Sequence, residues 1–205
     1  MKNLKPMFSE LQAELDIAIV GSGPAGLSAA SRAQELGCNY VLFEGESHAS
    51  DTIYKYQKGK HVMAEPGFLP LRSGMKFEAG KREQVLGTWD KQLAEQRVNI
   101  QYRKKVASIR KLNDGAGPFQ LECEDGTTTT ARTVILGIGL QGNIRKIGTE
   151  GDDLPNVQYT LDDPDEFQDE TIIVIGAGDA AIENALGLMG KNKVFLVNRR
   201  EEFAR

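Results

Sequence analysis

The chain has 205 residues, of which 40% are hydrophobic and 26% charged, and its formal net charge is −4. This length and balance suit a water-soluble globular protein with one large domain or two small ones. The acidic balance argues against nucleic-acid binding, which needs clustered lysine and arginine. No apolar run approaches the ~20 residues of a membrane span, and residues 1–14 lack the apolar core of a secretory signal. We therefore expect a cytoplasmic protein without a membrane span.

The first elements in chain order predict the start of a βαβ unit. Residues 16–20 form a short apolar run that ends at Gly21, which indicates a buried strand. Residues 27–36 repeat apolar side chains at helical spacing, and Gly37 follows them as a cap. Residues 39–43 are a second predicted strand, and Glu44 stands directly after it.

Glycines at positions 21, 23 and 26 join the first predicted strand to the helix. Gly21 permits a tight turn, Gly23 lets a pyrophosphate approach the backbone, and Gly26 lets helix and strand pack closely. The helix N-terminus offers N–H groups to phosphate, and an acid at the end of the second strand, here Glu44, can bind a ribose hydroxyl. This order of elements predicts a dinucleotide site.

The middle of the chain is less regular. Residues 47–87 predict a long loop of a kind that is usually functional, and residues 88–96 a helix in which Trp89 and Leu93 face the core. Residues 98–102, 106–111 and 119–124 alternate like strands, with turns at Asp114-Gly115 and Asp125-Gly126, and predict a small antiparallel ribbon. Residues 134–139 predict a buried strand and residues 142–168 a polar connector.

The glycine pattern then repeats. Residues 171–175 predict a strand, residues 176–181 a second glycine turn ending in alanine, residues 182–189 a helix and residues 193–197 a strand. Counting 23 residues from Gly176, the distance that separates Gly21 from Glu44, reaches Arg199, with Arg200 next. Arginine pairs with a 2′-phosphate where an acid would repel it, so the second turn predicts NADP(H) rather than NAD(H).

Together these elements predict an α/β fold with tandem Rossmann-like dinucleotide-binding modules and a small antiparallel β ribbon in the first. We expect a first dinucleotide-binding domain at residues 1–145, a connector at 146–168 and the start of a second, NAD(P)H-binding domain at 169–205. One βαβ unit is short for such a module, so we expect the chain to be a fragment of a longer protein.

The residues around both turns resemble the thioredoxin-reductase-like flavoproteins. The run at residues 19–27 with Glu44 resembles their FAD module, and the run at residues 174–183 with Arg199 and Arg200 resembles their NADPH module. The resemblance implies FAD contacts at the first turn, at Glu44, at a hinge strand ending at Gly139, and at the backbone near Val106 and Ala107. The site residues expected from both modules are Gly21, Ser22, Gly23, Pro24, Ala25, Gly26, Glu44, Val106, Gly139, Gly176, Gly178, Asp179, Ala180, Arg199 and Arg200.

The sequence departs from that family at two places. Thioredoxin reductases carry Cys-x-x-Cys before the second module, where this chain has Tyr159 and Asp162; Cys38 and Cys123 are also too few for a disulfide framework or zinc site. The NADPH signature His-Arg-Arg-x-x-x-Arg is altered, since Asn198 replaces the histidine and Ala204 the last arginine, with Arg205 one place late. The resemblance is therefore to dithiol-free members, the ferredoxin–NADP reductases and bacillithiol-disulfide-reductase-like proteins; residues 51–56 resemble the latter.

The expected function is hydride transfer from NAD(P)H, with NADPH favoured, to FAD and on to a small-molecule or redox-protein acceptor that the sequence does not identify. Catalysis requires no particular side chain, because the cofactor supplies the redox chemistry; His61 is either a proton donor or a solvated loop residue. The acids at positions 162–166 indicate a solvated connector, and we expect no metal site. A flavin monooxygenase and a non-catalytic nucleotide-binding fragment or sensor remain alternatives, and a homodimer is left open.

Overall fold

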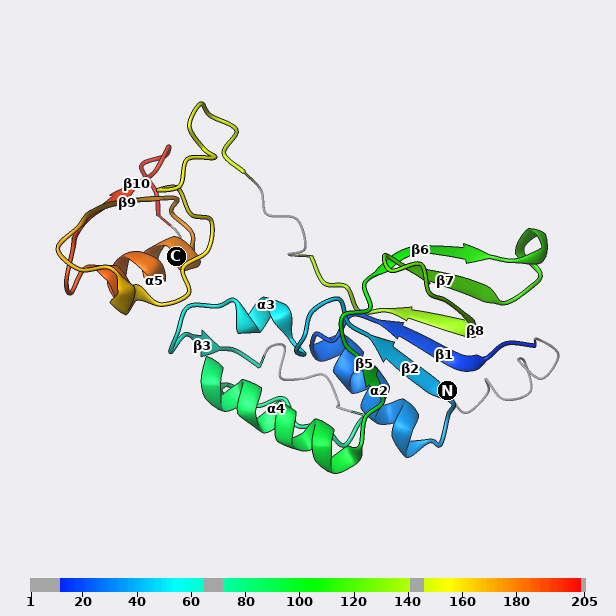
Figure 1. Cartoon of the computed structure of the whole chain (residues 1–205). Coiled ribbons are helices and arrows are strands. Elements are labelled where there is room, and N and C mark those ends of the chain that lie inside the picture. Colours follow the sequence, from blue (N-terminus) through cyan, green and yellow to red (C-terminus); the bar gives the residue numbers. More distant parts are fainter. Residues whose placement is uncertain (1–11, 65–71, 141–145, 204–205) are drawn as a thin grey trace. The chain divides into compact units, whose positions relative to one another are not determined.

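The structure is a computed structural model that describes residues 12–64, 72–140 and 146–203. The chain divides into two compact units (Figure 1). Unit 1 comprises Met1–Tyr54 and His61–Ile144, and unit 2 comprises Lys55–Lys60 and Arg145–Arg205. Each unit is described by itself below.

Unit 1 is an α/β fold whose six-stranded sheet has the order β5-β2-β1-β8-β7-β6 (Figure 1). The central strand β1 (Leu15–Val20) pairs in parallel with β2 (Tyr40–Phe43) and with β8 (Thr128–Leu136). β5 (Ile100–Gln101) extends the parallel part beyond β2. On the other side, β7 (Phe119–Cys123) and β6 (Val106–Lys111) continue the sheet in antiparallel pairing, which confirms the predicted ribbon.

Two helices pack against one another beside the parallel strands. α2 (Pro24–Glu35) contacts β1, β2 and α4 (Arg82–Gln96). Leu27, Ala30 and Ala33 form the buried side of α2. Trp89 and Leu93 are buried in α4, which confirms their assignment to the core, and the Trp89 indole donates to the Lys76 carbonyl at 3.1 Å.

The long predicted loop contains more structure than its sequence pattern indicates. It holds the short helix α3 (Asp51–Tyr54) and a two-stranded ribbon of β3 (His61–Val62) and β4 (Gly80–Lys81). α4 begins at Arg82, six residues earlier than expected, and the Gln84 side chain accepts from the backbone N–H of its N-cap, Lys81, at 3.3 Å. η1 (Asn113–Gly115) forms one turn of the β6–β7 ribbon.

Two strand predictions are wrong in part. The strand expected at residues 98–102 is only β5, and it belongs to the parallel sheet beside β2 instead of the antiparallel ribbon. The strand expected at residues 134–139 is the last part of β8, which starts at Thr128 and ends at Leu136. Gly137 and Gly139 follow the strand, and Gly139 adopts a positive φ of 64°, which glycine tolerates.

Unit 2 repeats the first half of unit 1. β9 (Thr171–Ile175) and β10 (Lys193–Val197) pair in parallel, and α5 (Asp179–Leu188) connects and contacts both strands. The 3-10 turn η2 (Pro164–Glu166) lies against α5. The segment 55–60 belongs to this unit, in which Lys58 pairs with Asp163 at 2.9 Å and Lys60 with Glu183 at 2.6 Å.

The described residues contain no helix that is both long enough and apolar enough to cross a membrane. Over the same residues, no three His, Cys, Asp or Glu side chains gather in a way that could hold a metal ion.

Candidate functional site

The first glycine turn (residues 21–26) is closed by backbone contacts that leave no room for side chains. Gly21 has a φ of +92°, and its N–H donates to the Phe43 carbonyl at 2.9 Å. A Cβ at Gly21 would lie 2.6 Å from the Gly137 carbonyl oxygen, and one at Gly26 would lie 1.8 Å from the Gly21 carbonyl oxygen. Both glycines are therefore required by the packing of α2 against β1 and of β1 against the end of β8.

Gly23 is different because the chain itself does not require a glycine there. Its φ is −69°, which any residue adopts, and a Cβ would meet only the Gly137 carbonyl oxygen, at 3.9 Å. Gly23 caps α2, which begins with Pro24, and no side chain bonds to the cap. A bare helix N-terminus beside a glycine that faces open space fits a phosphate group, which would accept the N–H groups there.

Glu44 is buried at the end of β2 and lies against the first glycine turn. Its Oε2 accepts from the Ser22 backbone N–H at 3.0 Å and from the Ser22 hydroxyl, while Oε1 accepts from the Glu46 N–H at 2.9 Å. The carboxylate is thus fixed within reach of the turn. Carboxylate oxygens each accept more than one hydrogen bond, so Oε1 retains capacity for a ribose hydroxyl.

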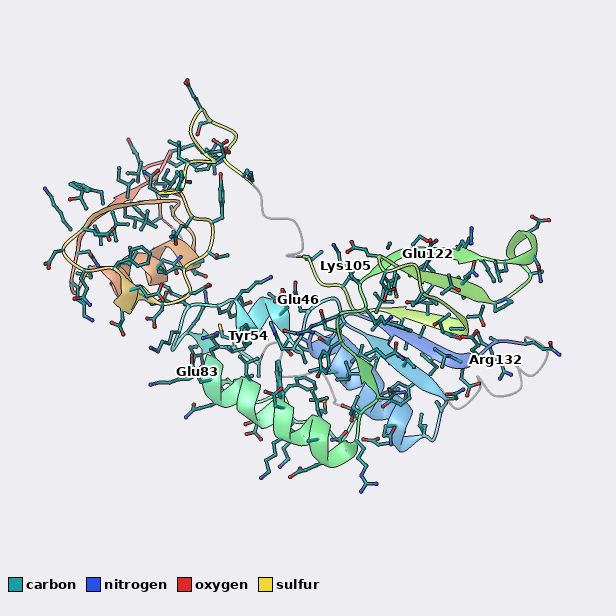
Figure 2. The ribbon with its side chains drawn as sticks, in the orientation of Figure 1. Glu46, Tyr54, Glu83, Lys105, Glu122 and Arg132 are labelled. Atoms are coloured by element: carbon teal, nitrogen blue, oxygen red, sulfur yellow. The ribbon has the colours of Figure 1, made fainter. Side chains whose placement is uncertain are left out.

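The start of β6 lies beside the end of β2. The backbone N–H groups of Arg103 and Lys104 donate to the carbonyls of Glu46 and Glu44, at 2.9 and 2.8 Å. Lys105 follows, and Figure 2 labels it together with Glu46. The pairing of β6 with β7 shifts register just after Val106, so a bulge interrupts the ladder at Ala107, where backbone groups of a bulged residue stay unpaired with the partner strand.

The structure thus brings together the first glycine turn, Glu44 and the segment before Val106. It adds Gly137, which the sequence analysis did not select: a Cβ there would lie 3.0 Å from the Gly26 nitrogen. Gly139, which the resemblance implied, has open space around its α-carbon and a φ of +64°. The backbone geometry at Gly137 depends on which segments meet across the sheet, and no local sequence pattern reports that.

Ser50 is a second residue that the sequence analysis missed. Its N–H and hydroxyl donate to the Ser22 carbonyl at 3.1 and 3.2 Å, and it adopts a φ of +61°. It therefore ties the start of α3 to the first glycine turn. His61 lies on β3 with an exposed side chain, where its backbone pairs with Lys81, so these contacts give it no place in the site.

The second glycine turn (residues 176–181) is built in the same way. Gly176 donates its N–H to the Val197 carbonyl at 2.9 Å, as Gly21 does to Phe43. A Cβ at Gly176 would lie 3.3 Å from the Ala181 Cβ, whereas Gly178, the N-cap of α5, has nothing within 4 Å. The second turn therefore also pairs a packing glycine with a glycine that faces open space. Asp179 and Ala180 follow it in the first turn of α5.

The register corrects one position of the predicted coenzyme site. Val20 pairs with Phe43 in unit 1, and Ile175 pairs with Val197 in unit 2. The residue that follows the second strand is therefore Glu44 in the first unit and Asn198 in the second. Arg199, which a count of 23 residues aligned with Glu44, therefore lies one position beyond the true equivalent. The count is off by one because the second βαβ unit is one residue shorter between its first glycine and the end of its second strand.

An open pocket of about 450 Å³ joins the second glycine turn to the end of β10, and its lining residues are Ala177, Asn198, Arg199, Arg200, Glu202 and Phe203. The predicted arginines and the predicted turn thus share one pocket. Asn198 shapes its rim, since its side-chain amide donates to the carbonyls of Arg200 and Glu202 at 2.7 and 2.8 Å. The substitutions at Ala204 and Arg205 lie outside the described residues.

Known proteins match this chain over both glycine turns and the pocket. Residues 18–205 match the family described as pyridine nucleotide-disulphide oxidoreductase. A ferredoxin–NADP reductase of Ignicoccus hospitalis is 30% identical over 190 residues, which cover 92% of this chain and 57% of that protein. The chain spans about half the length of the curated relatives that it matches.

Solved structures share the fold. The bacillithiol disulfide reductase Bdr of Staphylococcus aureus superposes with a TM-score of 0.79 at 21% identity, over 94% of this chain and 59% of that chain. A flavin-containing monooxygenase of Stenotrophomonas maltophilia superposes with a TM-score of 0.68 at 18% identity, over 91% and 58%. Identities this low show the fold alone. The family match over residues 18–205 confirms the resemblance drawn from the two glycine turns: the chain belongs to the pyridine nucleotide-disulphide oxidoreductase family.

Proposed function

We propose that the chain is part of an FAD-dependent oxidoreductase that transfers hydride from NADPH to FAD and then passes electrons to a further acceptor. The observation that carries the proposal is the repeated turn: Gly23 and Gly178 each face open space at a bare helix N-terminus. Two such turns in one chain call for two dinucleotides, one in each of two tandem Rossmann-like modules. The proposed limits are 1–145 for the FAD domain, 146–168 for the connector and 169–205 for the start of the NAD(P)H domain.

FAD belongs to the first turn in this proposal. The helix N-terminus after Gly23 would hold its pyrophosphate, Glu44 would accept a hydroxyl of the adenosine ribose, and the backbone at Val106 and Ala107 would face the adenine. Glu44 supports this role because protein N–H groups already fix its carboxylate beside the turn. The remaining residues proposed to lie around the flavin dinucleotide are Gly21, Ser22, Pro24, Ala25, Gly26 and Gly139.

NADPH belongs to the second turn. Arg199 and Arg200 line the pocket beside Ala177, and guanidinium groups there would contact the 2′-phosphate. Hydrogen bonds to charged groups contribute about 1.5–3 kcal/mol each, so Arg199→Ala or Arg200→Ala should weaken NADPH relative to NADH about tenfold to a hundredfold. Gly176, Gly178, Asp179 and Ala180 would carry the pyrophosphate.

In the proposed reaction, FAD held at the first turn would supply the redox chemistry, since its flavin can accept the two electrons and one proton of a nicotinamide hydride. The protein's part is to hold the two ring systems against one another and to keep water away. The acceptor is a small molecule or a redox protein; the relative in Ignicoccus hospitalis is named for ferredoxin. A cytoplasmic location stays a prediction, and homodimer formation stays open.

A flavin monooxygenase is the second candidate because one shares the fold. Such enzymes carry the fingerprint Phe-x-Gly-x-x-x-His between their two glycine motifs, and this chain has no such run between residues 26 and 176. The absence favours the reductase. A protein that binds the nucleotides without catalysis is the third candidate.

Anaerobic titration, repeated in air, separates the three candidates. The FAD-loaded chain, or the longer protein that contains it, is mixed with NADPH or NADH while its visible spectrum is recorded. The proposal expects the flavin absorbance to bleach with NADPH and to return when a one-electron acceptor is added. A monooxygenase would bleach in the same way without oxygen, but in the repeat in air it would consume oxygen and insert one atom into a substrate. A bound flavin that neither coenzyme reduces would overturn both enzymatic readings.

A further inference from the structure

The pocket at the end of β10 contains an acidic residue in addition to its two arginines. Glu202 lines it together with Arg199 and Arg200, whereas the adjacent Glu201 does not. The Asn198 amide holds the Glu202 carbonyl at 2.8 Å, so the backbone at this position is fixed. The turn that Asn198 stabilises therefore places Glu202 at the pocket.

Neither arginine is neutralised within the part of the chain that the structure describes. In residues 146–203, the ion pairs and side-chain hydrogen bonds include none made by the guanidinium of Arg199 or Arg200, and none made by the carboxylate of Glu202. All three residues are exposed to solvent. A ligand that enters the pocket therefore meets two positive side chains, Arg199 and Arg200, and one negative side chain, Glu202.

The register adds a second observation. Asn198 occupies the place that Glu44 holds in the first unit, and its amide is used on backbone carbonyls. The residue after the second strand therefore supplies no carboxylate for a ribose. The acid that lines this pocket is Glu202, four residues after Asn198.

We propose that Glu202 is a specificity-determining residue, which accepts the hydroxyls of the adenosine ribose and opposes a 2′-phosphate. The pocket then binds NADH as well as NADPH, with the arginines favouring the phosphate and Glu202 limiting that preference. An acid at this edge selects NAD because it bonds the 2′-hydroxyl, and an arginine selects NADP. The inference rests on the proposed function, since it concerns the coenzyme of the same site.

Calorimetric titration with two fragments of the coenzyme tests this inference without any redox reaction. Adenosine 2′,5′-bisphosphate represents the NADP half and AMP the NAD half. Glu202→Gln removes the charge and keeps the volume. It should raise the ratio of bisphosphate affinity to AMP affinity about two- to fivefold, the effect of one exposed charge pair. Added salt should reduce the gain.

Glu201→Gln is the matched control, because it removes an equal charge from the neighbouring position outside the pocket. The inference expects this variant to leave the ratio at its wild-type value. If both variants raise the ratio equally, or neither changes it, Glu202 does not select the coenzyme, although the proposed function stands. If the wild-type chain binds neither fragment, the proposed coenzyme site fails, and the inference fails with it.

Discussion

Two glycines of the first turn and one that follows β8 make close backbone contacts. A Cβ added at Gly21, Gly26 or Gly137 would lie 3.0 Å or less from a backbone atom of one of the other two glycines. The first two were predicted from their spacing, because a turn and a helix approach are local features. Gly137 was not, since its constraint arises only when β8 lies beside β1.

Gly26→Ala should destabilise unit 1 strongly. Its Cβ would lie 1.8 Å from the Gly21 carbonyl oxygen, and an overpacked contact between backbones costs about 1–3 kcal/mol or more. Urea unfolding followed by circular dichroism measures the loss. Gly87→Ala is the control: Gly87 lies inside α4 with nothing within 4 Å of its Cβ position, so alanine should stabilise the fold by about 0.5–1 kcal/mol. Equal effects of the two changes would show that the close approach at Gly26 is wrong.

The cysteines should have no part in electron transfer. Cys38 and Cys123 are both free and belong to different segments, and Tyr159 and Asp162 stand where thioredoxin reductases carry their dithiol. The double variant Cys38→Ala, Cys123→Ala should therefore reduce bound FAD with NADPH at the wild-type rate, measured by anaerobic stopped flow. Because Cys123 is buried, unfolding is measured alongside. A large loss of rate in a folded variant would contradict the dithiol-free mechanism.

At the scale of elements, the predictions succeeded where hydrophobic periodicity and punctuation agree. β1, α2, β2, β9, α5 and β10 lie within a few residues of their expected limits. The failures have physical causes. β5 is only two residues long, and it pairs with β2, which lies far earlier in the chain. α3 starts directly after Ser50, which bonds to Ser22, twenty-eight residues earlier in the chain. No local stretch of sequence reveals that contact.

The site was predicted best at the turns and worst at the edge of the coenzyme pocket. Glu44 was found because an acid after a strand is a local signal. Arg199 was aligned with Glu44 by counting, and the count failed because the two βαβ units differ by one residue in length. Glu202 and Asn198 gained their places only from the turn that Asn198 organises.

The turn between β7 and β8 should make the ribbon sensitive to acid. Lys104 and Thr127 hydrogen-bond the Asp125 carboxylate, and they hold its pKa far below the ordinary value of 3.8. A carboxyl group whose pKa is lower in the folded state stabilises the fold above the unfolded pKa. That contribution is lost as the pH falls through the folded pKa. Stability should therefore decline below about pH 4.

Asp125→Asn should remove this contribution. The variant should be less stable than wild type at pH 7, and the difference should shrink as the pH is lowered from about 4 towards 2. Urea unfolding at each pH measures it. Asp114→Asn, in the turn η1 of the same ribbon, is the control and should follow the wild-type profile. A constant difference between Asp125→Asn and wild type across this range would contradict the role given to the carboxylate.

At the scale of the whole molecule, the chain contains the same βα turn twice, once in each compact unit. In both, the first glycine donates to the last residue of the second strand, and the second glycine caps the helix in front of open space. The two differ after that strand: a buried glutamate follows in unit 1, and an amide with two arginines in unit 2. The central claim is that this one difference assigns FAD to the first turn and NADPH to the second.

A pair of matched substitutions tests that claim most directly. Gly23→Val and Gly178→Val each place a side chain where a pyrophosphate would lie. In both variants the added Cβ has no neighbour closer than 3.9 Å. Each variant is titrated with FAD, followed by flavin fluorescence, and with adenosine 2′,5′-bisphosphate, followed by calorimetry. Gly23→Val should lose FAD and keep the bisphosphate, and Gly178→Val should do the reverse. Loss of the same ligand in both variants, or of neither ligand in either, would contradict the assignment of one dinucleotide to each turn.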